Sequence, residues 1–130
     1  MRNILTKLRT VLAELNRPGA MRDDWFGWAA GQMAHAMIGA VLAGALLFFL
    51  PPIWAFAVAA LGYALAKEVP DYLRAPGWAG ARDCTQDALF VTAGAALAVA
   101  IDGTHDRLFF VAVGAALVGL AIGVFERVRK

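Results

Sequence analysis

The chain has 130 residues, of which 61% are hydrophobic and 17% are charged, and its net charge is +2. Typical globular domains contain roughly 45–50% apolar and about 25% charged residues, so this composition excludes a disordered tail and favours a membrane protein. The single cysteine, Cys84, excludes an internal disulfide framework. The composition therefore predicts a location in the lipid bilayer but indicates no chemical function by itself.

The first segment, residues 1–18, carries apolar residues at helical spacing with basic residues between them. This pattern predicts an amphipathic helix on the membrane surface, with its basic side chains toward anionic headgroups. A cleavable signal peptide is the alternative, but charges interrupt the apolar run and no small-residue cleavage site follows it. Pro18 and Gly19 end the predicted helix.

Residues 19–130 form the predicted membrane domain. About 20 residues in a helix cross the hydrocarbon core, and the apolar segments predict four transmembrane helices at about 27–50, 53–68, 86–101 and 108–125. The helices pair as two hairpins, the first of which turns at Pro51-Pro52. The many prolines, glycines and charges of residues 67–87 predict a water-facing loop between the hairpins. The predicted fold is all-α, with four spans and an N-terminal interfacial helix.

Basic residues are distributed unequally between the two predicted sides. Arg107 lies alone on one side, and the other side holds Arg2, Lys7, Arg9, Arg17, Arg22, Lys67, Arg74, Arg82, Arg127, Arg129 and Lys130. Positive residues accumulate on the cytoplasmic side, so we expect a bacterial inner-membrane protein with both termini in the cytoplasm. Anionic lipid headgroups on that side are the expected partners, and nucleic acid is not.

Small residues recur at four-residue spacing in the last predicted helix, at Ala115, Gly119 and Gly123. Small residues let membrane helices approach closely. They predict packing inside the four-helix bundle, with a homo-oligomer face or a contact in a larger membrane complex as the alternative.

Ionisable residues from separate segments converge at the predicted cytoplasmic end of the bundle. They are His35, Glu68, Asp71, Asp83 and Asp87, with Gln32, Lys67, Arg74 and Arg82 in supporting positions. Polar residues that enter a membrane usually face the protein interior and often mark function. This agreement between segments makes them the candidate site.

A histidine with several carboxylates suits a divalent metal such as Mg²⁺, Mn²⁺ or Zn²⁺. Such an ion can bind a lipid headgroup and supply hydrolytic chemistry. The alternative is structural: His35 hydrogen-bonds to Gln32, Asp83 caps a helix, and Glu68 pairs with Arg74 or Arg82.

The order of these residues resembles a family. His35, then Lys67-Glu68-x-x-Asp71, then Asp87-Ala88-Leu89 followed by Thr92 and Gly94, is similar to VanZ-like and YfiM-like small polytopic membrane proteins, including phage-encoded relatives. The resemblance covers about residues 32–98, and Asp71 and Val91 depart from the usual pattern. It implies a polytopic fold and a link of VanZ to glycopeptide resistance, without an established enzymatic activity.

Three functions follow from the sequence. The first is a cytoplasm-facing site for a metal ion or a lipid headgroup. The second is a holin-like, pore-forming lysis protein of a phage, which the small size, the alanine- and glycine-rich spans and the basic C-terminus favour. The third is a structural or accessory subunit of a larger membrane complex.

Overall fold

The computed structural model describes Thr6, residues 24–103 and residues 106–129. Its helices are α2 (Trp25–Leu47), α3 (Pro52–Tyr63), the π-helix η1 (Ala64–Glu68), α4 (Val69–Arg74), α5 (Trp78–Gly103) and α6 (Asp106–Val128). The described residues contain no strand, and four stretches are long and apolar enough to cross a membrane. The predicted all-α fold with four spans is confirmed. Apart from Thr6, the predicted interfacial helix over residues 1–18 lies outside the described residues.

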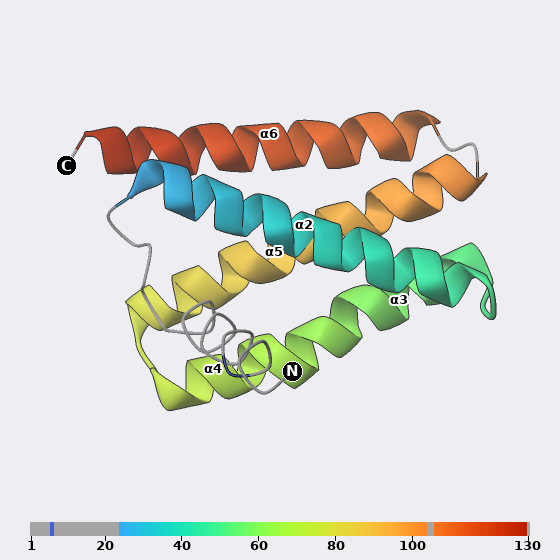
Figure 1. The fold of residues 1–130 in the computed structure, drawn as a ribbon, viewed down its shortest axis with the longest axis horizontal. Helices are drawn as coiled ribbons and strands as arrows, with labels where there is room; N and C mark the ends of the chain where they lie inside the picture. Colours follow the sequence, from blue (N-terminus) through green and yellow to red (C-terminus); the bar gives the residue numbers. More distant parts are fainter. Residues whose placement is uncertain (1–5, 7–23, 104–105, 130) are drawn as a thin grey trace.

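The helices run alternately up and down. The start of α2, the α4–α5 turn and the end of α6 lie at one end of the bundle, on the left of Figure 1, and the α2–α3 turn, the end of α5 and the start of α6 lie at the opposite end. Asp24 caps α2, because its carboxylate accepts hydrogen bonds from the backbone N–H groups of Phe26 and Gly27 at 3.1 and 2.9 Å. The basic residues Lys67, Arg74, Arg82, Arg127 and Arg129 belong to the left end by their positions in these helices.

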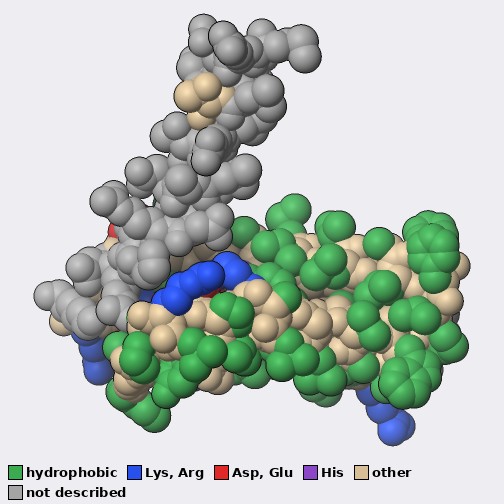
Figure 2. All heavy atoms as spheres, turned by 90° about the horizontal axis from the view of Figure 1, so that it is seen from below, with side chains coloured by type: hydrophobic (Ala, Val, Ile, Leu, Met, Phe, Trp, Pro, Cys, Tyr) green, Lys and Arg blue, Asp and Glu red, His purple; other side chains and the backbone are tan. Residues whose placement is uncertain are grey.

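Most buried side chains are small, although Trp28 and Phe90 are also buried, and many large apolar side chains are exposed. Ala43, Ala59, Ala95 and Val99 form a buried cluster. Large apolar side chains such as Phe48, Leu61 and Phe110 are exposed. Hydrophobic side chains extend along the face in Figure 2, with Lys and Arg toward its left part and at its right end. This arrangement is typical of helices that pack through small residues and present large residues to lipid, so the fold indicates a membrane protein.

Helices α2 and α5 cross with their backbones in contact. A Cβ atom added at Gly39 would lie 1.9 Å from the Val91 carbonyl oxygen, and one added at Gly94 would lie 1.8 Å from the Ala36 carbonyl oxygen. Glycine is therefore required on both sides of the crossing. The crossing lies one turn from His35 along α2, so it fixes the distance between the two helices that carry most of the candidate site.

The prediction of a water-facing loop over residues 67–87 is wrong. Helix continues through Pro70 to Arg74, and only residues 75–77 separate it from α5. The N–H of Val69 bonds to the carbonyl of Ala64, five residues earlier, so the helix widens to a π turn just before the proline. Pro70 then lies in the first turn of α4, where its missing N–H costs least.

Two glycines of α6, Gly119 and Gly123, face other helices of the same chain. A Cβ added at Gly119 would lie 3.3 Å from the Phe90 ring, and one added at Gly123 would lie 1.9 Å from the Trp28 ring. Ala115 is exposed. Both glycines thus contribute to packing within the bundle.

Candidate metal site

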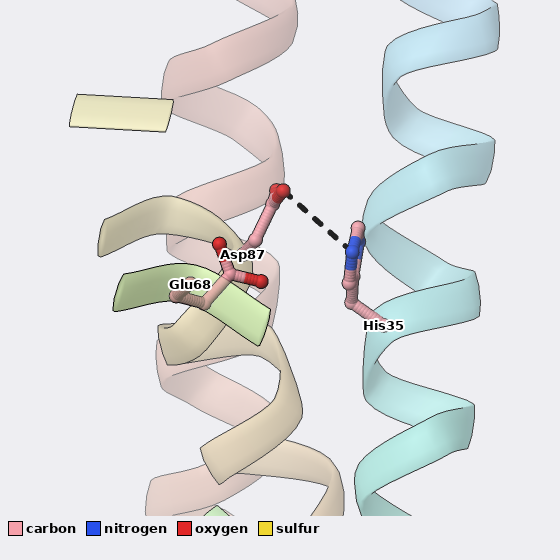
Figure 3. A group of neighbouring side chains, drawn as sticks. All are labelled: His35, Glu68 and Asp87. Carbon is pink, nitrogen blue, oxygen red and sulfur yellow. Dashed lines mark ion pairs between the residues drawn. The ribbon is translucent and has the colours of Figure 1, made fainter. Parts of the chain in front are cut away.

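Three ionisable side chains from three separate helical segments meet inside the bundle. They are His35 of α2, Glu68 at the end of η1 and Asp87 of α5 (Figure 3). Each offers one ligand atom, and these three atoms lie within 4.8 Å of one another. The residues are 33 and 19 positions apart along the chain, so only the tertiary fold brings them together.

The group lies deeper in the bundle than the sequence predicted. Glu68 does not end its helical segment, which runs six residues further to Arg74, and Asp87 does not open its helix, which begins nine residues earlier at Trp78. At a rise of 1.5 Å per residue, Glu68 and Asp87 lie about 9 and about 14 Å from those helix ends, and His35 lies about 15 Å from Trp25. The three residues are thus embedded within the spans.

The imidazole of His35 is oriented by a backbone carbonyl. Its Nδ1 lies 2.9 Å from the carbonyl oxygen of Gly31, and because a carbonyl only accepts, Nδ1 carries the proton. Nε2 faces Asp87, with 3.6 Å between Nε2 and Oδ2. The ring packs edge-to-face against Tyr63, with centroids 6.1 Å apart. Metal-binding histidines commonly donate their other ring N–H to a backbone carbonyl, as Nδ1 of His35 does here.

The carboxylate of Asp87 is held from one side. The amide Nε2 of Gln32 donates to its Oδ1 at 2.8 Å, which leaves Oδ2 facing His35. Gln32 is buried and lies three residues before His35, so the same face of α2 supplies both contacts.

Glu68 is the most deeply buried member of the group. It is 5% exposed, and its Oε1 has no hydrogen-bond partner among the described residues. No lysine or arginine in the described part of the chain forms an ion pair with Glu68 or Asp87. Two carboxylates and an imidazole therefore lie together within the helices without an ion-paired lysine or arginine, an arrangement that favours a bound cation or a proton.

The other predicted site residues lie outside this group. Asp71 is ion-paired to Lys67 and to Arg74, the latter with 2.8 Å between Nη1 and Oδ1. Asp83 lies one turn before Asp87 on α5, and it is not among the three residues that converge.

Arg82 of α5 pairs with Glu126 near the end of α6. This ion pair links the two helices and lies outside the candidate site. The predicted pairing of Glu68 with Arg74 or Arg82 is not formed.

Two residues near the site carried no signal in the sequence. Tyr63 precedes Glu68 by five residues, and positions five apart lie about 140° around an ordinary α-helix, so spacing alone does not put both at one site. The π turn between them changes this relation. Cys84 of α5 and Glu68 of η1 both line an open groove between their helices.

The chain was compared with protein families, with curated proteins and with solved structures, and no significant match was found. The resemblance to VanZ-like and YfiM-like proteins stays a prediction.

Proposed function

We propose that the protein binds a divalent metal ion inside its membrane domain, through Nε2 of His35 and one carboxylate oxygen each of Glu68 and Asp87. Three protein ligands leave a position open for water or for a substrate oxygen, as in catalytic zinc sites. Following the distribution of basic residues, we place this site in the cytoplasmic half of a bacterial inner membrane.

The separation of His35 from Asp87 is the observation that carries the proposal. At 3.6 Å, Nε2 and Oδ2 are too far apart for a hydrogen bond. Two ligands at about 2.1 Å from a tetrahedral zinc ion lie about 3.4 Å apart, close to the distance found here. In the neutral tautomer with its proton on Nδ1, His35 offers an electron pair on Nε2 to a metal that Oδ2 of Asp87 also binds.

The donor set favours zinc. Magnesium prefers oxygen ligands in near-ideal octahedral geometry, and imidazole nitrogen is a poor match for it. Imidazole with carboxylates suits zinc, and manganese binds the same donors more weakly. We expect affinities in the order Zn²⁺, Mn²⁺, Mg²⁺.

The pore-forming alternative draws no comparable support. Its association face used Gly119 and Gly123, and these glycines contact Phe90 and Trp28 of the same chain. An accessory-subunit role gives no reason for the buried Oε1 of Glu68, which has no hydrogen-bond partner among the described residues. Metal binding accounts for the buried group directly.

Elemental analysis of the purified full-length protein tests the proposal. The protein is loaded with zinc in lipid nanodiscs, freed of excess metal and measured beside His35→Ala, Glu68→Gln and Asp87→Asn. Asp83→Asn is the matched control, because it removes a carboxylate one turn away on the same helix.

We expect about one zinc per chain in the wild type and in Asp83→Asn, and less than a tenth of that in the three ligand variants. Helical circular dichroism verifies that each variant is folded. A wild-type protein without stoichiometric metal, or ligand variants that keep it, would contradict the proposal.

A further inference from the structure

An open groove of about 390 Å³ runs between the helical segment Pro52–Arg74 and α5. Its volume falls within the roughly 300–1,000 Å³ of small-molecule sites. Ala64 and Tyr72 line it from one side, and Ala81, Ala88 and Leu89 line it from the other. The groove therefore lies between two candidate membrane spans.

The lining is mostly apolar, and its polar members are Glu68, Tyr72, Cys84 and two threonines. The hydroxyl of Thr85 donates to the carbonyl of Ala81 at 2.6 Å, and that of Thr92 donates to the carbonyl of Ala88 at 2.7 Å. Both hydroxyls are thus satisfied within their own helix. Among the lining residues, Glu68 alone carries a carboxylate.

Glu68 joins the groove to the candidate metal site. It lines the groove, and it also contributes a ligand atom to the group with His35 and Asp87. A hydrocarbon chain in the groove would therefore bring the polar part of the same molecule next to Glu68.

We infer that the groove holds an acyl chain of a diacyl phospholipid, with an ester carbonyl oxygen of that lipid on the metal. The inference rests on the proposed zinc site.

Depth and charge favour the ester over the phosphate as the metal-bound group. Each headgroup layer is about 5–8 Å thick, and Glu68 lies about 9 Å from Arg74 along its helix. When Arg74 lies at the phosphate level, Glu68 lies just below the inner edge of the headgroup layer, so the ester groups at that edge are the lipid oxygens nearest to it. Lys67 and Arg74 share one carboxylate, Asp71, so this end of the segment keeps a positive charge for the phosphate.

Native mass spectrometry of the zinc-loaded, delipidated protein tests the inference with two synthetic lipids. They are diester phosphatidylglycerol and its diether analogue, which has the same chains and headgroup but no carbonyl. The groove is filled by Ala88→Phe and, further from Arg74 toward the bilayer centre, by Ala64→Phe. Ala115→Phe is the control, because Ala115 is exposed on α6. Zinc content is measured on every sample first.

We expect the groove variants to keep zinc and to bind the diester lipid at least tenfold more weakly than Ala115→Phe does. We also expect the diether lipid to bind zinc-loaded wild type more weakly than the diester, and the two to bind Glu68→Gln equally. Equal binding by groove and control variants, or equal binding of both lipids to zinc-loaded protein, overturns the inference and leaves the metal site standing. A protein without zinc overturns the proposed function itself.

Discussion

Glu68 and Asp71 lie three residues apart in the same helical segment, yet their carboxylates have opposite surroundings. Asp71 is held between Lys67 and Arg74, near the end of the segment. Glu68 is 5% exposed, and one of its oxygens has no hydrogen-bond partner in the described part of the chain. The fold neutralises the shallow carboxylate with its own basic residues and does not do so for the deeper one.

The difference separates a structural carboxylate from a ligand. An ion pair near the membrane surface contributes about 0–1 kcal/mol and holds a helix end in place. A buried carboxylate without a basic partner is costly, so it persists where something outside the chain compensates for it. Asp87 and neutral His35 offer electron pairs to a cation beside Glu68, and the nearby Lys67 directs its ammonium to Asp71. The comparison therefore favours a bound cation.

The ion-paired end of the molecule is expected to face the cytoplasm. In a Cys84→Ser background, a membrane-impermeant thiol reagent added outside intact cells should label Pro51→Cys and leave Ala75→Cys unlabelled. Permeabilised cells, in which both positions react, provide the control. Outside labelling at Ala75→Cys would reverse the orientation and place the site in the other half of the bilayer.

Chelation should separate Glu68 from Asp71 by thermal stability. A ligand that binds only the folded state adds about 2.7 kcal/mol when its free concentration is a hundredfold above Kd. Removing zinc should therefore lower the Tm of the wild type and of Asp71→Asn by the same amount, and leave the Tm of Glu68→Gln unchanged. A chelator effect on Glu68→Gln as large as on the wild type would argue against Glu68 as a ligand.

The amide of Gln32 should matter to the metal although it does not touch it. Gln32→Leu removes the donor that orients Asp87, and loss of such a contact typically weakens metal affinity about 10–100-fold. Competition with a fluorescent zinc chelator measures this affinity. Gln86→Leu is the control, because Gln86 lies in a separate shallow groove with Trp78 and Arg82. Equal affinities for the two variants would remove Gln32 from the site.

Without metal, the two carboxylates should affect stability in opposite directions. Glu68→Gln removes repulsion from Asp87, so we expect the free energy of unfolding of the metal-free protein to rise by roughly 1 kcal/mol. Asp71→Asn breaks two surface ion pairs, and we expect a loss of about 0.5 kcal/mol. Unfolding in mixed micelles by a denaturing detergent measures both. A loss of stability in metal-free Glu68→Gln would mean that its charge is already compensated within the chain.

The four spans could be predicted from the sequence because hydrocarbon thickness fixes the length of an apolar helix. His35, Glu68 and Asp87 could be named as candidates, since ionisable residues are conspicuous in apolar segments. The helix through Pro70 could not, because proline is usually read as a helix end and the π turn that precedes it has no sequence signature. That error also set the depth of the site too shallow and left Asp71 and Asp83 among the candidate ligands.

Titration of the metal-free protein with zinc tests directly whether Glu68, and not Asp71, is a metal ligand. Isothermal titration calorimetry is performed in nanodiscs on the wild type, Glu68→Gln and Asp71→Asn, which differ by one carboxylate on the same helical segment. We expect one zinc site in the wild type and in Asp71→Asn, and no binding in Glu68→Gln. Zinc binding by Glu68→Gln with wild-type affinity, or its loss in Asp71→Asn, would contradict the account.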